Sequence, residues 1–399
     1  MRQNEKLTER NRDRALGCIV GGAVGDALGY AVEFEQWPYI RNTYGDKGIT
    51  RYQLAGNGKA LISDDTQMTL FTAAGILLGM TRGHMRGIMG RIDTYCHWTY
   101  LDWLHTQEWD LRKPNERSDS WLMDVPELYA HRAPGNTCLS ALKSLENNKE
   151  PQNNSCGCGG VMRTAPLAIL DYLHGYADAE YEYCDMVAAE AARITHKHPL
   201  GFLPSAVLND ILMQIFDGEI DRGTSLSDIV HNAIKRLPSI KSETDKDRTY
   251  GELWPDEVAT LRRLLKYAME LTVRDIPDHV AIEKIGGGWT GHEALAIAIY
   301  SAVKHSNNFE NAIVSSVNHS GDSDSTGAIC GNIMGALLGR NAIPDHYTKD
   351  LELLDIIEEM AEDLFTGCII SEYMDRDAPE ARRWFEKYCL FKRPSKDNR

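Results

Sequence analysis

The segment Asn318–Gly339 constrains the fold most, because it joins an acidic cluster directly to a buried helix. Asp322 and Asp324 stand among three hydroxyl side chains within five consecutive positions. The residues that follow are small and apolar, with hydrophobic side chains at the spacing of a helix buried on most sides. One acid would be enough to cap such a helix. A tight group of oxygen ligands instead favours a hard divalent cation such as Mg²⁺.

Two familiar ion-binding and phosphate-binding motifs do not fit this segment. An EF-hand loop beginning at Asp322 would place Ile333 where calcium binding requires a bidentate Glu. A phosphate-binding P-loop requires a Lys after its glycine, and the segment has none. The remaining interpretation is a metal site that another part of the chain completes.

A second acidic cluster, Ser63-Asp64-Asp65, also precedes an apolar run with helical spacing. These two acids could act only as favourable charges at the start of a helix. The two clusters nevertheless share one composition, and together they offer enough anionic oxygen for a pair of Mg²⁺ ions. Four carboxylates brought together without cations would raise one another's pKa values. The sequence therefore predicts a site for two Mg²⁺ ions.

Glycine recurs every four residues from Gly17 to Gly29, which predicts a helix face that another backbone can approach closely. The pattern is typical of membrane helix dimers, but Asp26 and the charged flanks exclude that interpretation. Asp26 and Glu33 are seven residues apart and face the same side of a helix. Each could pair with an Arg, or both could lie buried near the acidic clusters.

The glycine-rich segment Asn154–Pro166 is predicted to be a loop that runs into a helix. Such a loop exposes backbone N–H groups to an anion, and the helix N-terminus adds positive potential. Cys156 and Cys158, together with His196 and His198, also allow a zinc site. Because the C-x-C spacing is unusual for structural zinc, we favour the anion-binding interpretation.

Two further segments allow a functional and a structural interpretation. His196 lies in a predicted buried segment, where a lone histidine is more often a hydrogen-bonded core residue than a catalyst. The segment Gly286–His292 contains Trp289 among glycines, so it could cover a sugar or a base, or it could be a plain turn.

The composition favours a protein with reduced cysteine thiols that binds neither nucleic acid nor membranes. The formal net charge of −15 argues against nucleic-acid and anionic-membrane binding. No run of 18 apolar residues is present, and Met1–Arg14 is polar, unlike a secretory signal. The nine cysteines are an odd number scattered over 399 residues, so we expect reduced thiols and a cytoplasmic location.

Helical periodicity dominates the chain and strict alternation is scarce, so we predict an all-α fold. We expect a polar extension at residues 1–13 and a single domain at residues 14–390. Besides the buried helix after Asp324, the predicted helices are Arg14–Phe34, Thr66–Leu78, Ile88–Leu101, Met162–Leu173, Ala177–Ile194, Leu200–Phe216, Leu226–Ile234, Asp256–Leu271, Glu293–Lys304 and Asp350–Phe365.

Five motifs occur in a fixed order: G-x-x-x-G-D-A-L-G-x-x-x-E-F, S-D-D-T-Q, C-G-G-V-M-R-x-A-P, T-H-x-H-P and N-H-S-G-D-S-D-S-T-G-A-I. Together they resemble the ADP-ribosylglycohydrolase family, from about Arg14 to Gly339. That family includes the hydrolase that reactivates ADP-ribosylated dinitrogenase reductase, ADP-ribosylarginine hydrolases and bacterial immunity hydrolases. The resemblance implies a single-domain orthogonal bundle of helices with two Mg²⁺ ions in a central cleft.

The resemblance also implies a role for individual residues. The metal ligands would be Ser63, Asp64, Asp65, Asp322, Asp324 and Ser325. The diphosphate-binding loop would be Ser155, Cys156, Gly157, Cys158, Gly159 and Gly160. Glu33 matches a mobile carboxylate near the scissile bond, with Asp64 or Asp65 as the alternative for proton transfer, and His196 matches a substrate-contacting histidine. Because Cys156 and Cys158 stand where some relatives have an aromatic residue and an Asn, Trp289 or a tyrosine is the candidate for holding adenine.

The expected function is Mg²⁺-dependent hydrolysis of the N-glycosidic bond between ADP-ribose and an arginine side chain of a modified protein, with ADP-ribose as product. The segments C-G-G-V-M-R and G-G-G-W resemble the arginine-directed bacterial branch. One alternative is an O-linked substrate: modified serine, O-acetyl-ADP-ribose or ADP-ribosylated nucleic acid. Another is a binding protein, either a lens-crystallin-like relative or an immunity protein that docks to an ADP-ribosyltransferase toxin through Met1–Arg12. Intact acids at all four ligand positions disfavour an idle protein.

Overall fold

The computed structural model describes residues 7–88, 90–108, 118–173, 181–242, 245, 247–370 and 378–389. In these residues the regular structure consists of helices and three isolated β-bridges, without strands, so the all-α prediction is confirmed. Residues 1–6 of the predicted extension, 177–180 of a predicted helix and residue 390 lie outside them. The α-helices are α2 Glu9–Tyr30, α3 Trp37–Tyr44, α4 Asp64–Arg86, α5 Ile92–Glu108, α6 Asn136–Glu146, α7 Ala165–Leu173, α8 Tyr181–Arg193, α9 Pro199–Phe216, α10 Leu226–Arg236, α11 Tyr250–Leu253, α12 Pro255–Thr272, α13 Asp278–Ile285, α14 Gly291–Lys304, α15 Phe309–Val317, α16 Ser323–Leu338, α17 Asp345–Thr348, α18 Leu354–Thr366 and α19 Pro379–Tyr388.

Two glycine-lined helices, α2 and α16, form the central contact of the fold. A Cβ atom built at Gly21 would meet the carbonyl oxygen of Gly331, and a Cβ atom at Gly331 would meet the carbonyl oxygen of Gly21. The same reciprocal contact joins Gly25 to Gly327. The close backbone approach predicted from the glycine spacing of α2 is therefore confirmed. Its partner, α16, carries glycines at the same spacing.

The two helices are antiparallel, and this places the acidic residues. Gly17 lies beside Gly335, whereas Gly29 lies beside Ser323. The C-terminal end of α2 therefore lies beside the N-terminal end of α16. As a result, the turn that carries Glu33 reaches the acidic end of α16.

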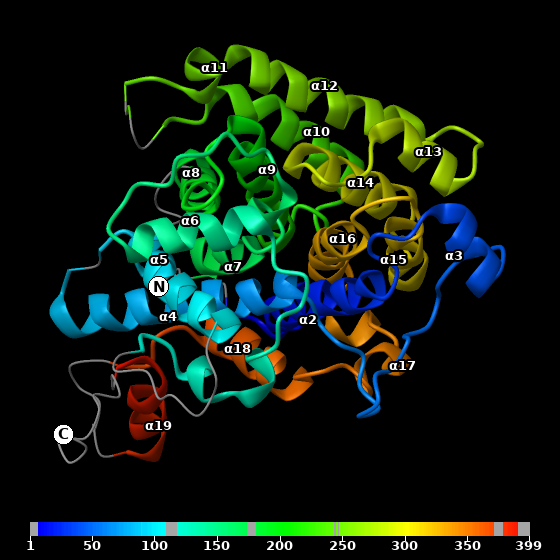
Figure 1. Ribbon diagram of the computed structural model, residues 1–399. Helices are drawn as coiled ribbons and strands as arrows, with labels where there is room; N and C mark the ends of the chain where they lie inside the picture. Colours follow the sequence, from blue (N-terminus) through cyan, green and yellow to red (C-terminus); the bar gives the residue numbers. More distant parts are fainter. Residues whose placement is uncertain are drawn as a thin grey trace.

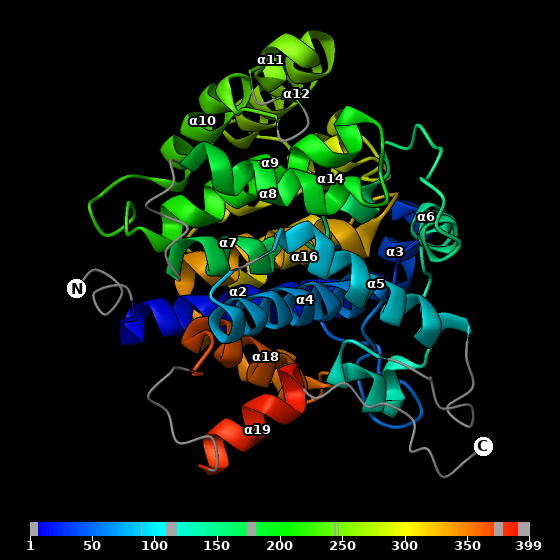
Figure 2. The same cartoon turned by 90° about the vertical axis from the view of Figure 1, so that its left-hand side faces the viewer.

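Helices α2, α4 and α16 form the middle of the molecule (Figures 1 and 2). Helices α10, α11 and α12 lie on one side of this middle layer, with α8, α9 and α14 between. Helices α18 and α19 lie on the opposite side. The contact between α2 and α16 is thus covered from both sides.

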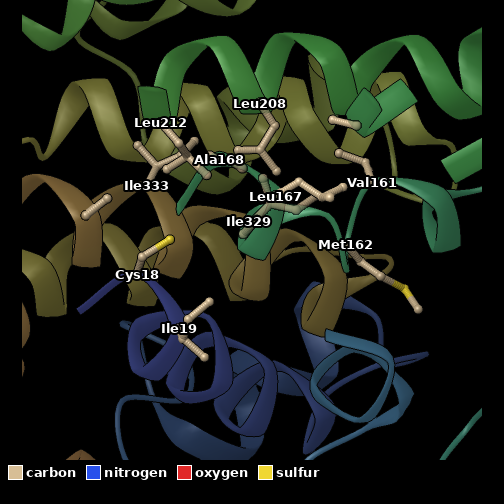
Figure 3. Close-up of a cluster of buried hydrophobic side chains, with 14 of the residues drawn as sticks. Cys18, Ile19, Val161, Met162, Leu167, Ala168, Leu208, Leu212, Ile329 and Ile333 are labelled. Atoms are coloured by element: carbon tan, nitrogen blue, oxygen red, sulfur yellow. The ribbon is translucent and has the colours of Figure 1, made fainter. Parts of the chain in front are cut away.

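An apolar cluster fixes this central pair against α7 and α9 (Figure 3). Its labelled side chains are at most 2% exposed, so each contributes nearly its full apolar area to stability, at about 25 cal/mol per Å². The labelled members on these helices are Cys18 and Ile19 of α2, Leu167 and Ala168 of α7, Leu208 and Leu212 of α9, and Ile329 and Ile333 of α16. Val161 and Met162 are further members of the cluster, and Met162 also lines the cavity described below.

Among the described residues, one helix could cross a membrane if only its length and its apolar composition are considered. It is α9, with 18 residues and a mean hydropathy of 1.3. However, 89% of α9 is buried inside the fold, as in the central helix of a globular core.

The region around Glu33 differs from the sequence prediction in two respects. Helix α2 spans Glu9–Tyr30 rather than Arg14–Phe34, so Glu33 lies in a turn after the helix. In addition, Trp37 begins α3, a helix that the sequence analysis did not predict. Pro38 accounts for this difference, since proline in the first turn favours the start of a helix.

Candidate active site

Most of the predicted site residues line one cavity of about 360 Å³, within the usual size of a small-molecule site. These residues are Glu33, Asp64, Asp65, Gly157, Cys158, Gly159, His196, Trp289, Asp322, Asp324 and Ser325. The predicted residues Ser63, Ser155, Cys156 and Gly160 are not part of the lining. We call Asp64, Asp65, Asp322 and Asp324 the acidic wall of the cavity. We call Gly157, Cys158, Gly159 and His196 its loop wall.

Asp26 of α2 joins the acidic start of α4 to the central helix pair. It is fully buried, and its carboxylate accepts hydrogen bonds from the backbone N–H groups of Ser63 and Thr66, all at 3.1 Å. These N–H groups belong to a helix N-terminus and have no partner within their own helix. Asp26 is thus buried beside the acidic clusters, and its role there is to position α4. Ser63 caps α4, since its hydroxyl accepts from the N–H of Asp65 at 3.2 Å.

The other half of the acidic wall comes from the start of α16. Asp322 caps this helix, and its Oδ1 accepts from the N–H of Ser325 at 3.2 Å. Oδ1 of Asp324 accepts from the same N–H at 2.9 Å. The thiol of Cys158 donates to Oδ2 of Asp322 at 2.7 Å, so this bond links the two walls.

Burial and mutual repulsion raise the pKa values of the acids in the cavity. Burial is the largest cause for Asp64, Asp65 and Asp324, and neighbouring carboxylates raise their pKa values further. Burial, followed by the charges of Asp324 and Asp322, likewise raises the pKa of Glu33 well above its usual range. When ionised, the carboxylates of the acidic wall therefore carry more negative charge than the surrounding protein groups compensate.

The acidic wall has the chemistry of a divalent-cation site. Within the described residues, no three His, Cys, Asp or Glu side chains already converge as a metal site. However, Oδ2 of Asp65 and Oε2 of Glu33 are buried and have no hydrogen-bond partner in the part of the chain that the structure describes. Every side chain of the acidic wall offers carboxylate oxygens as metal ligands, the ligand type that Mg²⁺ prefers. These residues fit a bound cation, which would supply the missing partners.

The zinc alternative has no support in the described residues. His198 caps α9, because its Nδ1 accepts from the N–H of Leu200 at 3.1 Å. Cys158 binds Asp322, as described above. The four side chains of the C-x-C and H-x-H motifs therefore do not form a metal site.

Backbone hydrogen bonds hold the loop wall to the segment that carries Trp289. The N–H of Gly291 donates to the carbonyl oxygen of Cys156 at 2.8 Å, and the N–H of Cys158 donates to that of Trp289 at 3.3 Å. Ser155 also stabilises the loop, because its hydroxyl accepts from the N–H of Gly157 at 3.3 Å. The predicted loop and the predicted Trp289 cover are thus parts of one structure.

His196 supports the loop wall as a neutral imidazole. It is 2% exposed, and its Nδ1 lies 3.0 Å from the hydroxyl of Thr195. Its ring packs against the glycine loop, since a Cβ atom at Gly159 would lie 3.0 Å from the ring carbon Cε1. Burial, followed by the charge of Arg163, lowers the pKa of His196 to about 3.

An exposed aromatic pair lies at the edge of the cavity. Phe34 and Trp289 stack with ring centroids 5.4 Å apart and an angle of 23° between their planes. Their exposed fractions are 62% and 44%, which is high for large apolar side chains. Phe34 has a φ of +69°, a conformation that non-glycine residues rarely adopt and one that is often found at functional sites. The sequence analysis did not assign Phe34 to the site, although it directly follows Glu33.

Sequence reasoning also missed the segment Ala133–Cys138, which lines the cavity between the two walls. The N–H of Gly135 donates to Oδ2 of Asp64 at 3.3 Å. The hydroxyls of Thr137 and Ser155 lie 3.0 Å apart. No local motif identifies this segment, because its place depends on contacts with residues distant in the sequence.

Comparison with known proteins confirms the resemblance found in the motifs. The sequence pattern of the ADP-ribosylglycohydrolase family matches residues 7–372. The chain is 23% identical to ADP-ribosylhydrolase ARH1 of Dictyostelium discoideum, over 90% of this chain and 97% of that protein. It is 25% identical to the ADP-ribosyl-dinitrogen reductase glycohydrolase of Rhodospirillum rubrum, over 86% of this chain and 91% of that protein. A solved structure, described as an ADP-ribosylglycohydrolase-related protein complex, shares the fold with a TM-score of 0.60 and 21% identity, covering 90% of this chain and 99% of its own.

Proposed function

This chain belongs to the ADP-ribosylglycohydrolase family, and we propose that it is a Mg²⁺-dependent hydrolase that releases ADP-ribose from arginine side chains of modified proteins. The observation that supports this proposal is the pairing of two unlike walls in one cavity. The acidic wall suits cations, and the glycine loop suits a diphosphate. We also propose a cytoplasmic location, consistent with free cysteines throughout the described residues.

The candidate ligands for two Mg²⁺ ions are Ser63, Asp64, Asp65, Asp322, Asp324 and Ser325. When bound, Mg²⁺ ions would orient the ribose hydroxyls and lower the pKa of a water molecule. Ser63 is the weakest candidate in this set, because its hydroxyl already caps α4 and the residue lies outside the cavity lining.

Glu33 is our candidate for the proton transfer at the scissile bond. Its carboxylate reaches the cavity from a turn rather than from a helix, and one of its oxygens is buried without a hydrogen-bond partner in the described residues. Cleavage of the bond at the ribose carbon passes through an oxocarbenium-like transition state, which requires a proton donor or acceptor nearby. Asp64 and Asp65 are the alternatives for this role.

The other lining residues would bind the rest of ADP-ribose. The N–H of Gly159 suits the diphosphate, whereas those of Gly157 and Cys158 already donate to Ser155 and Trp289. The exposed ring of Trp289, stacked on Phe34, suits the adenine, since every base can stack on an aromatic side chain.

Two observations favour arginine as the modified residue. The segments C-G-G-V-M-R and G-G-G-W resemble the arginine-directed branch of the family. In addition, the acidic wall and a net charge of −15 favour a guanidinium-bearing substrate over one with an uncharged linkage. The docking alternative has no comparable support: Arg12, at the end of the proposed docking segment, lies in α2 and pairs with Glu362 at 2.8 Å.

One assay distinguishes the substrates. The protein is incubated with Mg²⁺ and with peptides that carry ADP-ribosyl-arginine or ADP-ribosyl-serine, or with O-acetyl-ADP-ribose, and the released ADP-ribose is measured. We expect the arginine peptide to be cleaved fastest. Release from the serine peptide at an equal or higher rate would overturn the arginine assignment. Release from none of the three would overturn the hydrolase proposal.

A further inference from the structure

Arg163 is a fully buried guanidinium behind the loop wall. Its N–H groups donate to the hydroxyl of Thr195 at 2.6 Å and to the sulfur atoms of Met68 and Cys138 at 3.2 and 3.4 Å. Its Cζ lies 4.4 Å from the centre of the Tyr100 ring. Within the described residues, no carboxylate pairs with Arg163, and its Nε has no hydrogen-bond partner.

A buried cation of this kind is costly for the fold. A charge moved from water into the protein interior is destabilising unless an opposite charge and hydrogen bonds compensate it. A hydroxyl, two sulfur atoms and an aromatic face compensate only in part. If the position served only to fill space, an apolar side chain of similar volume would be the more stable choice. The positive charge at this position therefore calls for a compensating negative charge from outside the core.

The neighbours of Arg163 place its charge directly behind the cavity. Cys138 lines the cavity, and its sulfur would lie 3.0 Å from a Cβ atom at Gly159. Thr195, the other close neighbour, precedes His196 of the loop wall. The guanidinium is thus separated from the glycine loop by a single layer of side chains. A charge in this dry environment is weakly screened, so its field extends into the cavity. It also contributes to lowering the pKa of His196.

We infer that Arg163 is a positioning residue that provides the counter-charge for the diphosphate of ADP-ribose, acting through the glycine loop without touching the substrate. This inference rests on the proposed function. The backbone of the glycine loop provides the contact surface, and Arg163 provides the net positive charge that this neutral backbone lacks. The loop wall in this way holds an anion beside an acidic wall that would otherwise repel it.

The first test removes the charge and keeps the volume. Calorimetric titration of the Arg163→Met variant with ADP-ribose, in Mg²⁺, should show binding weakened roughly tenfold or more. The KM for the modified peptide should rise, while kcat at saturation changes little. The matched control is Tyr100→Leu, which removes the ring beneath the guanidinium but keeps the charge. We expect it to lower the melting temperature and leave ADP-ribose affinity within about twofold of wild type.

The second test is the Arg163→Lys substitution, which replaces the guanidinium with an ammonium group that can lose its proton. Burial lowers the pKa of a lysine, whereas an arginine stays charged. The ADP-ribose affinity of the Arg163→Lys variant should therefore fall as the pH rises from about 6 to 9, beyond any change in the wild type. A merely structural role of Arg163 would leave the affinity of this variant independent of pH. This test also decides the question if the Arg163→Met variant does not fold.

The outcomes separate this inference from the proposed function. A wild-type protein that does not bind ADP-ribose contradicts the proposed function itself. Wild-type-like affinity in the Arg163→Met variant, or a pH-independent Arg163→Lys variant, contradicts only the role of Arg163. An equal loss of affinity in the Tyr100→Leu control would also overturn it, because that loss would then follow from loosened packing.

Discussion

The two walls of the cavity differ in how their charges are balanced. The acidic wall gathers four carboxylates whose pKa values are raised mainly by burial, and a buried oxygen of Asp65 has no hydrogen-bond partner in the described residues. Behind the loop wall lies the reverse situation, in which the buried Arg163 has no carboxylate partner among the residues that the structure describes. Each wall thus lacks charge of the opposite sign.

This difference indicates what each wall is built to bind. The acidic wall is suited to cations, and the loop wall is suited to an anion. The two walls meet at the hydrogen bond from the Cys158 thiol to Asp322, and this neutral thiol brings no positive charge to the acidic wall. The acidic wall is held by the contact between α2 and α16, whereas the loop wall is held by the segment at Trp289–Gly291. Both walls would gain the opposite charge that they lack from a substrate that carries a diphosphate and whose bond is cleaved with the help of bound cations.

Removal of one carboxylate from the acidic wall should have the largest effect. We expect Asp322→Ala and Asp65→Ala each to abolish turnover and weaken Mg²⁺ binding, because each removes a charged oxygen ligand that water replaces poorly. Activity assays and calorimetric Mg²⁺ titration measure the two effects. Either variant with wild-type Mg²⁺ affinity would remove that carboxylate from the ligand set.

Replacement of Glu33 should separate the chemistry from the binding of ions and substrate. Glu33→Gln keeps the shape of the side chain and removes its ability to exchange a proton. We expect kcat to fall by roughly 10²–10⁴-fold, with ADP-ribose affinity and melting temperature little changed. If kcat stays at the wild-type value and only stability falls slightly, Glu33 is structural, and the proton transfer passes to Asp64 or Asp65.

A substitution in the central helix pair should disturb the acidic wall and spare the loop wall. In Gly25→Ala, the new Cβ atom would meet the carbonyl oxygen of Gly327, and we expect a loss of about 1–3 kcal/mol of stability. The folded variant should lose Mg²⁺ affinity more than ADP-ribose affinity. Gly56→Ala is the matched control, because open space surrounds Gly56 and its φ is not positive. Equal melting temperatures for the two variants would contradict the close contact between α2 and α16.

The stabilising effect of Mg²⁺ should depend on pH in a direction set by the acids. Burial and neighbouring carboxylates raise the pKa values of Asp64, Asp65 and Asp324 in the folded chain. Between the unfolded and the folded pKa values the folded state binds more protons, so without Mg²⁺ the stability falls as the pH rises through this range. Mg²⁺ must displace protons at low pH. We therefore expect Mg²⁺ to raise the melting temperature by a few °C more at pH 8 than at pH 5. A larger increase at pH 5 would contradict this reasoning.

The sequence predicted those parts of the site that depend on local chemistry. The acidic starts of α4 and α16 were recognised because carboxylates and hydroxyls cluster before an apolar helical run. The glycine spacing of α2 predicted a close backbone neighbour, and the matching spacing at Gly327, Gly331 and Gly335 could have identified α16 as that neighbour. The domain boundaries and the individual roles of the site residues remain predictions.

The parts that the sequence did not predict depend on tertiary contacts. Segment Ala133–Cys138 carries no motif, and its place in the cavity lining depends on contacts such as those with Asp64 and Ser155. Phe34 could be assigned to the rim only once its stacking on Trp289 was known. The isolation of Arg163 from carboxylates is likewise a property of its surroundings and not of its motif.

The most direct test of this account is the dependence of turnover on the acidic wall's cations. The rate of ADP-ribose release from an ADP-ribosyl-arginine peptide is measured in excess EDTA and then during titration with Mg²⁺. We predict no turnover in EDTA, and recovery that saturates as the acidic wall fills. Full activity in EDTA would contradict the account.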